Sequence, residues 1–555
     1  MLRRRTHPPA GLRLPPHLGG GLPLAGHTVE FVRDTIGLLE RGQREHGEIA
    51  AMDVAGRRMV AVYGPDAHEA VFRAKDDVLN PCEAYKIMTP VFGEGMVYDA
   101  PPDRMNEQMK MLLPALKDGR MRTYGETILD EVMTSIEDWG DEGEIDIVDY
   151  CRVLTNFTSS HCLLGKEFRE GMTGEFARIY HDLERGVTPL AYINANLPIP
   201  SFRKRDQARV RLVELIGEIV DNRVNSGRTG EDFLQTLMDA KYKSGVPLTH
   251  DEITGMLLAA MFAGHHTSSV TTAWTLVELA RHPAYMRRVL AELDDAYGVD
   301  GATTYQSLRN IPVTENAVKE SLRLYPPLFM LIRVAMRDFE FKGYHIEKGT
   351  WVLISPTVSH RIPEVFAHPY CFDPDRFAPP RHEDKRDWAF IAFGGGRHKC
   401  MGNAFALLQV KAILATLLRR YELELVDRDV KPDFHGLVIG PSEPCRLRYR
   451  KRVHAEVERA PSVSVPEKIE PTTEDRVQLT ITLDHDMCQG HAVCLEEAPE
   501  VFTLGDDGKV ALLTDRPDPS LNEKVRTAAA YCPQRTIQLH EAPADAPAEA
   551  ACPFH

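Results

Sequence analysis

The stretch Phe393-Gly-Gly-Gly-Arg-His-Lys-Cys400-Met-Gly402 combines three consecutive glycines, three basic residues and a cysteine. Glycine lets the backbone pass close to a neighbouring group, and the apolar periodicity of residues 403–418 predicts a helix directly after this stretch. Cys400 would then lie at a helix N-terminus, where the helix dipole and the basic neighbours favour a thiolate. Such a thiolate suits an axial ligand of a haem iron. A turn with an inert thiol is the alternative.

Two upstream motifs carry paired charges. Glu320-Ser-Leu-Arg323 places a carboxylate and a guanidinium one helical turn apart, which by itself indicates a surface ion pair. Phe372-Asp-Pro-Asp-Arg376-Phe supplies a second arginine, so Glu320, Arg323 and Arg376 are expected to form a buried network.

With these three motifs in this order, the chain resembles the cytochrome P450 family between about residues 24 and 450. The resemblance implies a mainly α-helical fold with small β-sheets, a haem b held by Cys400, and O₂ as co-substrate. Haem–thiolate chemistry cleaves the O–O bond.

The oxygen-activating helix of that family is expected at residues 253–281, after the capping box Thr249–Glu252. At its middle, Ala263 leaves room over a flat cofactor, and Thr267 is expected to hydrogen-bond dioxygen or orient a water. A bond from Thr267 to the carbonyl four residues earlier is the alternative. His266 stands where most family members have an acid, and an imidazole can relay protons near neutral pH.

Three segments are similar to the sterol 14α-demethylase subfamily: residues 263–269, 85–99 and 331–335. The resemblance implies that the haem propionates are held by Tyr85, Lys110, Arg333 and His398. It also implies a substrate wall formed by Ile87, Met88, Phe92, Ala263, Met330 and Leu331. Each of these residues has an ordinary surface or packing role as its alternative. Ile87 stands where relatives have Phe or Leu, which makes room for a 4,4-dimethyl sterol.

A second group of cysteines lies near the C-terminus. Cys488-Gln-Gly-His491-Ala-Val-Cys494 and Cys532-Pro533 resemble bacterial ferredoxins. Three thiolates predict a [3Fe–4S] cluster. A [4Fe–4S] cluster with His491 as fourth ligand and a Cys₃His zinc site are the alternatives. The segment is acidic, and Arg397, Lys399 and Lys411 are expected to form a complementary basic face.

Five segments follow from these patterns: an N-terminal extension (1–23), a haem domain (24–450), a flexible linker (451–475), a small α+β ferredoxin domain (476–541) and a disordered tail (542–555). The linker is rich in proline, serine and charge and shows no apolar periodicity. It would keep the ferredoxin at high effective concentration around the haem domain.

The amino-acid composition limits which classes of partner we expect for this chain. The 555 residues carry 66 basic and 81 acidic side chains, a net charge of −15, which argues against a nucleic-acid binder. Ten cysteines are too sparse for a disulfide scaffold, and the six outside the iron sites are expected to be reduced thiols. No apolar run reaches the length of a membrane span, and we expect a cytoplasmic monomer. No Gly-x-Gly-x-x-Gly opens a βαβ unit, so electrons from NAD(P)H require a separate ferredoxin reductase.

The leading hypothesis is a sterol 14α-demethylase, which removes the 14α-methyl group as formate in three oxidations and draws electrons from its own tethered ferredoxin. A P450 hydroxylase of another terpenoid, steroid or fatty acid is the second hypothesis. The third, from another class, is a haem-based ligand sensor with a redox reporter domain.

Overall fold

The structure is a computed structural model. It describes residues 8–116, 118–170, 174–187, 191, 194–230, 232–297, 303–434, 438–452, 477–485, 487–488, 490, 492–532 and 536–543. The chain divides into two compact units, Met1–Ala115 with Arg122–Arg452, and Val453–His555 with Leu116–Met121. Each unit is described by itself.

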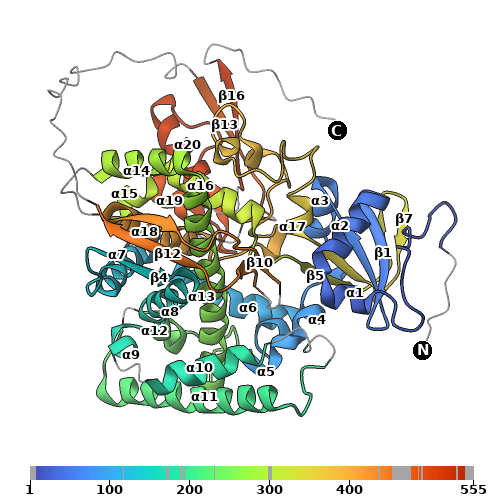
Figure 1. Ribbon diagram of the computed structural model, residues 1–555, viewed down its shortest axis with the longest axis horizontal. Helices are drawn as coiled ribbons and strands as arrows, with labels where there is room; N and C mark the ends of the chain where they lie inside the picture. The colour runs from blue at the N-terminus through green and yellow to red at the C-terminus, as the bar shows by residue number, and fades with distance from the viewer. Residues whose placement is uncertain are drawn as a thin grey trace. The chain divides into compact units, whose positions relative to one another are not determined.

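The large unit is mainly helical (Figure 1). Its α-helices are α1 (Thr28–Arg33), α2 (Thr35–His46), α3 (Pro65–Arg73), α4 (Cys82–Tyr85), α5 (Thr89–Phe92), α6 (Pro102–Leu112), α7 (Asp118–Ser135), α8 (Ile147–Leu164), α9 (Lys166–Glu170), α10 (Gly174–Arg185), α11 (Pro200–Ser226), α12 (Phe233–Asp239), α13 (His250–Arg281), α14 (Pro283–Tyr297), α15 (Tyr305–Arg309), α16 (Pro312–Leu324), α17 (Pro356–Ser359) and α18 (Asn403–Arg420). Short 3₁₀ turns include η1 (Lys86–Met88), η2 (Val97–Asp99), η3 (Leu113–Leu116), η5 (Pro374–Phe377), η6 (Glu383–Lys385) and η7 (Gly396–His398).

Small sheets accompany these helices. The largest has the order β1-β2-β8-β5-β3, formed by β1 (Ile49–Val54), β2 (Arg57–Val62), β8 (Trp351–Ile354), β5 (Leu331–Ala335) and β3 (Leu79–Asn80). In this sheet the β2–β8 pair is parallel and the other pairs are antiparallel. The others are β4 (Glu142–Asp146), β12 (Arg446–Lys451) and β9 (Tyr421–Leu425) in one sheet, β6 (Phe339–Phe341) with β7 (Tyr344–Ile346), and β10 (Pro432–Asp433) with β11 (Gly440–Pro441). The predicted mixture of many helices and small sheets is confirmed.

The expected N-terminal extension takes part in this fold. Leu18 is 1% exposed and packs in the core beside β1 and α2. Isolated bridges join Arg13 to Tyr344 and His17 to Ala51. The described part of the extension is therefore joined to two sheets, through Tyr344 of β7 and Ala51 of β1, and Leu18 adds to the core.

Helix α13 crosses the large unit and contacts α8, α11, α16 and α18 (Figure 1). It begins with the predicted capping box, since the side chains of Thr249 and Glu252 each bond the other's backbone N–H. It ends at Arg281, two residues before Pro283, whose ring cannot be accommodated in a helix interior. Trp274 anchors its second half by stacking on Tyr325, with ring centroids 3.7 Å apart. This length and anchoring fix where the middle of α13 lies.

The small unit pairs β13 (Val477–Leu483) with β16 (Ile537–Pro543) in an antiparallel sheet. Between them lie α19 (Val493–Glu497), β14 (Phe502–Leu504), β15 (Val510–Leu512), η9 (Pro519–Leu521) and α20 (Asn522–Tyr531). Strand β16 continues two residues past the expected domain end at residue 541, because Val477 and Gln478 pair with Pro543 and Ala542. The predicted linker, from residue 453, and the predicted tail, from residue 544, lie outside the described residues.

No helix among the described residues has both the length and the apolar character needed to cross a membrane.

Candidate active site

The loop before α18 is shaped by its glycines. Gly394 and Gly396 have φ angles of +70° and +65°, and a Cβ at Gly396 would lie 1.9 Å from the Phe72 carbonyl oxygen. The Cys400 N–H donates to the Phe393 carbonyl at 2.9 Å and closes the loop. Cys400 therefore lies directly before the N-terminus of α18, as the sequence predicts.

Cys400 is exposed to solvent, and the surrounding protein shifts the pKa of its thiol. Burial raises this pKa, while the N–H of Gly402 and the charge of Lys399 act to lower it. Without a bound cation, desolvation therefore outweighs the groups that favour the expected thiolate. A bound cation such as iron would deprotonate the thiol outright, so Cys400 fits a metal ligand.

Arg333 is brought to the same region by β5. It is 7% exposed, and among the described residues its guanidinium donates one hydrogen bond, to the Ile332 carbonyl. Burial lowers its pKa, and the groups that act to raise it include Tyr85, Tyr98 and Asp76. A buried guanidinium that has spare donors, and that no described carboxylate pairs, fits an acidic group of a bound ligand, such as a haem propionate.

Two tyrosines lie in the surroundings of both Arg333 and Cys400. The rings of Tyr85 and Tyr98 lie 5.1 Å apart. Burial raises the pKa of Tyr98, with further electrostatic effects from Tyr85, Arg333 and Cys400. The sequence analysis predicts Tyr85 as a propionate donor but gives Tyr98 no role, although both lie in the segment 85–99.

The other two predicted propionate donors, His398 and Lys110, lie in different surroundings from each other. His398 bonds Asp76 through Nε2 at 2.7 Å. Burial acts to raise the pKa of Asp76, but the hydrogen bond and charge of His398, with Arg397 and Arg333, lower it overall. Lys110, in the last turn of α6, has an exposed side chain. The structure therefore brings Arg333, Tyr85 and His398 into one region and leaves Lys110 at the surface.

At the middle of α13, the Thr267 side chain hydrogen-bonds a backbone carbonyl of its own helix, which is the alternative given above to a bond with dioxygen or water. Its hydroxyl donates to the Ala263 carbonyl at 2.6 Å. Ala263 is exposed, whereas Met261 and His265, two residues to either side of it, are buried. A small exposed side chain here is what the expected space over a flat cofactor requires, and that role stays a prediction.

A carboxylate from another helix meets the two histidines. Oε1 of Glu184, in α10, lies 3.1 Å from His265 Nδ1 and 2.8 Å from His266 Nε2. Burial acts to raise the pKa of Glu184, but the two imidazoles outweigh it and lower the pKa to about 2. Glu184 stands 81 residues before His265, and no local pattern distinguishes it from the other acids of its helix.

The predicted substrate wall divides into two groups. Phe92 and Met88 pack in the core beside α13, where the Phe92 ring meets Phe262 edge-on at 6.1 Å. Ile87 packs against Phe202 of α11. Met330 and Leu331 pack against the cores on the two sides of the five-stranded sheet.

The predicted charge network is buried. Arg323 donates two 2.8 Å bonds to the two oxygens of Glu320, Arg376 donates to Glu320 at 3.1 Å, and all three side chains are 0% exposed. The arginines also donate to the carbonyls of His360, Pro369, Cys371 and Ala367. The network joins α16 to the segment before the Cys400 loop, which makes it a structural clamp. Lys411, expected on a basic face, is instead buried and ion-paired with Glu315 at 2.9 Å.

In the small unit, Cys488, Cys494 and Cys532 lie close together. Burial raises the pKa of Cys494 to about 12, with Cys532 and Cys488 adding to the shift. The N–H of Val510 donates to Cys488 Sγ, and Thr536 offers its N–H and hydroxyl to Cys532 Sγ. Hydrogen bonds to sulfur suit cluster ligands, so the three cysteines fit an iron–sulfur cluster. His491 lies outside the described residues.

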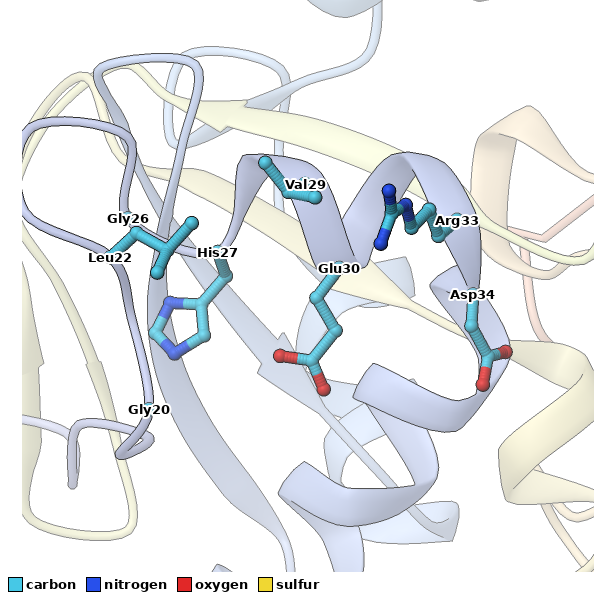
Figure 2. A pocket seen from close by; sticks show the side chains of 8 residues that line it. All are labelled: Gly20, Leu22, Gly26, His27, Val29, Glu30, Arg33 and Asp34. Atoms are coloured by element: carbon cyan, nitrogen blue, oxygen red, sulfur yellow. The ribbon is translucent and has the colours of Figure 1, made fainter.

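A shallow pocket lies elsewhere, between the Gly20–Gly26 loop and α1 (Figure 2). Two of its polar side chains have protein partners, since Glu30 accepts two hydrogen bonds from Arg41 Nη2 and His27 Nε2 bonds the Gly19 carbonyl. None of the predicted site residues lines it, so we assign it no catalytic role.

Known proteins resemble this chain over most of its length. Residues 16–447 match the family described as Cytochrome P450, and residues 481–539 match the family described as 4Fe-4S single cluster domain. A sterol 14α-demethylase of Mycobacterium tuberculosis is 45% identical over 79% of this chain and 98% of its own. A sterol 14-demethylase of Arabidopsis thaliana is 37% identical over 79% of this chain and 92% of its own, and a human lanosterol 14-alpha demethylase is 34% identical over 80% and 88%.

Solved structures share the fold of the large unit. The retinoic acid-bound cyanobacterial CYP120A1 covers 80% of this chain and 100% of its own, with 23% identity and a TM-score of 0.71. The cytochrome P450DA haem domain covers 80% and 98%, with 22% identity and a TM-score of 0.71.

Proposed function

The chain belongs to the cytochrome P450 family, and we propose that this haem monooxygenase is a sterol 14α-demethylase with its own electron-transfer domain. The observation that carries the proposal is the combination of an exposed Cys400 before α18, an exposed Ala263 in the middle of α13 and a buried Arg333 that no described carboxylate pairs; these offer a metal ligand, a small side chain and a buried cation. The sterol is proposed from the 45% identity with relatives that are named as sterol 14α-demethylases.

Haem bound here would be held by Cys400, with Arg333, Tyr85 and His398 as donors to its propionates. It would supply the iron that activates O₂. The proposed reaction oxidises the 14α-methyl group three times and releases it as formate.

The chain's own residues position the substrate and handle protons. The apolar side chains around Phe92 and Ile87 would exclude water and hold a rigid tetracycle, since small misplacements of a reacting carbon are costly. The Thr267 hydroxyl keeps its proton on the Ala263 carbonyl, which leaves its lone pairs free to accept a hydrogen bond. His266, hydrogen-bonded to Glu184, would pass protons from the α10 side toward the middle of α13.

Electrons are proposed to enter through the small unit. With three thiolates, a [3Fe–4S] cluster is the assignment we favour over [4Fe–4S], and a separate reductase would supply electrons from NAD(P)H. The described cysteines are all unpaired, which is typical of a reducing compartment, and we place the protein in the cytoplasm.

Incubation of the purified holoenzyme with lanosterol, NADPH and a surrogate ferredoxin reductase tests the proposal. We expect a low-spin to high-spin absorbance shift on sterol binding and one formate per demethylated sterol. Absence of both would overturn the demethylase assignment. Turnover of another terpenoid, steroid or fatty acid under the same conditions would support the hydroxylase alternative.

A further inference from the structure

The cluster of Glu184, His265 and His266 has the composition of a transition-metal site. Two imidazoles and one carboxylate are the protein ligands of several catalytic zinc ions, which keep a fourth position for water. The three ligand atoms lie within 4.8 Å of one another. Such a mixed nitrogen and oxygen donor set favours zinc and its neighbours over magnesium or calcium.

The second observation is the hydrogen bond on the far side of His265. Its Nε2 lies 2.8 Å from the carbonyl oxygen of Arg152 in α8. A carbonyl only accepts, so Nε2 carries the proton, and in a neutral imidazole the Nδ1 lone pair then faces the carboxylate of Glu184 at 3.1 Å. A metal-binding histidine is oriented in this way, with its other ring nitrogen donating to a backbone carbonyl.

The Nδ1 lone pair and the carboxylate both accept, so a shared proton or a metal ion has to lie between them. His265 is 2% exposed, and burial lowers its pKa although the hydrogen bond and charge of Glu184 act to raise it. His266 adds a third donor atom at 2.8 Å from the same carboxylate oxygen. The two carboxylate–imidazole separations, 3.1 Å and 2.8 Å, are slightly shorter than those around a tetrahedral zinc ion with bonds of about 2.0–2.1 Å, so small side-chain rotations would admit the ion.

We propose that Glu184, His265 and His266 form a binding site for Zn²⁺ beside the middle of α13. The ion would take the place of the proton that otherwise joins the carboxylate to the imidazoles. Zinc bound here would slow proton supply to the site. That consequence rests on the proposed function, whereas zinc binding itself does not.

Calorimetric titration of the haem- and cluster-loaded full chain with ZnCl₂ tests the site without turnover. We expect the wild type to bind one more equivalent than Glu184→Gln, His265→Gln or His266→Gln. Glutamine retains a polar amide in each place, and the haem absorption spectrum of each variant reports whether the fold is intact. His266 is the most exposed of the three, with 28% of its side chain accessible, so its substitution disturbs packing least.

Glu131 provides a matched control. It also accepts from a histidine, His161 Nδ1 at 2.8 Å, but its second oxygen is already paired with Arg169 at 3.0 Å. Glu131→Gln should keep the full zinc stoichiometry. Unchanged zinc binding in every folded variant of the three ligands, or an anomalous zinc peak in crystals only at other side chains, would overturn the site.

Discussion

The hydroxyl of Thr267 donates a 2.6 Å hydrogen bond to the carbonyl oxygen of Ala263, one turn earlier in α13. Thr271, Thr272 and Thr275 bond back to carbonyls in the same way. Side chains that bond back along a helix are held in one rotamer. Thr267 is therefore preoriented at the middle of α13, with its oxygen available as an acceptor.

Thr267→Ala should uncouple electron consumption from product formation. We expect sterol product per NADPH to fall on the order of tenfold, because a positioned hydroxyl that accepts or relays a proton is lost. Thr267→Ser retains the hydroxyl and should stay within a few-fold of the wild type. Product yield and NADPH consumption measured together provide the check. Equal coupling in Thr267→Ala and the wild type would contradict a role of this hydroxyl in turnover.

Glu320→Gln should destabilise the large unit strongly. Arg323 and Arg376 are 0% exposed and would lose their shared carboxylate. Removing one partner of a buried ionic network costs about 3–5 kcal/mol. The exposed pair Arg73–Glu69, with its side chains 48% and 49% accessible, provides the control, and Glu69→Gln should change stability by less than about 1 kcal/mol. Urea unfolding followed by tryptophan fluorescence measures both, and similar losses in the two variants would refute the clamp.

The contrast between these residues shows what sequence can predict. Glu320 and Arg323 lie three residues apart, so helical geometry alone indicates that they meet. Cys400 and the capping box are local features in the same sense. Glu184 and Asp76 are different, because they meet His265 and His398 across 81 and 322 residues. Such contacts depend on how whole helices pack, and no periodicity in the chain encodes them.

Burial was the other quantity that sequence could not supply. Lys411 has the appearance of a surface lysine in an amphipathic helix, yet it is 7% exposed and paired with Glu315. The Cys400 thiol has flanking positive charges, yet desolvation outweighs them and raises its pKa, and two of those neighbours, Arg397 and His398, pair with Asp76. A sequence shows which side chains carry charge, but it does not show how deeply the fold buries them.

Cys532→Ala should separate the two functions of the chain. We expect it to abolish reductase-driven turnover because the cluster loses one of three thiolates. The absorption spectrum of the reduced haem–carbon monoxide complex should remain, since Cys532 packs in the core of the small unit. Loss of both signals would mean that the two units do not fold independently. Cys371, which is exposed in the large unit, provides a control through Cys371→Ala.

Thr536→Val should make the cluster potential more negative. Thr536 is 1% exposed, and its hydroxyl and N–H lie 3.2 Å and 3.4 Å from Cys532 Sγ. Hydrogen bonds to cluster sulfur stabilise the reduced state, and valine removes the hydroxyl at nearly constant volume. A tenfold change in the reduction equilibrium corresponds to about 59 mV for one electron, and we expect a shift up to that size. An EPR-monitored redox titration measures it. Thr536→Ser should keep the wild-type value, and a potential unchanged in the valine variant would contradict the assignment.

Glu315 should make the large unit sensitive to acid. Burial acts to raise its pKa, but Lys411 and Lys319 outweigh burial and lower the pKa from 4.5 to about 2. Between these values the unfolded chain binds a proton that the folded chain does not, so stability falls as the pH falls from about 5 toward 2. The full effect on the free energy of unfolding is about 3 kcal/mol, because each tenfold difference in proton affinity between the folded and unfolded chains corresponds to about 1.4 kcal/mol.

Glu315→Gln removes this contribution. The variant should be less stable than the wild type above pH 5 and should show a shallower loss between pH 5 and 3. Glu184, whose pKa is also about 2, keeps its share of the slope in both proteins, so the difference between the two curves isolates Glu315. Urea midpoints measured at half-unit pH steps provide the comparison, with Glu69→Gln expected to run parallel to the wild type. Parallel curves for Glu315→Gln and the wild type would show that its ion pairs with Lys411 and Lys319 do not stabilise the fold.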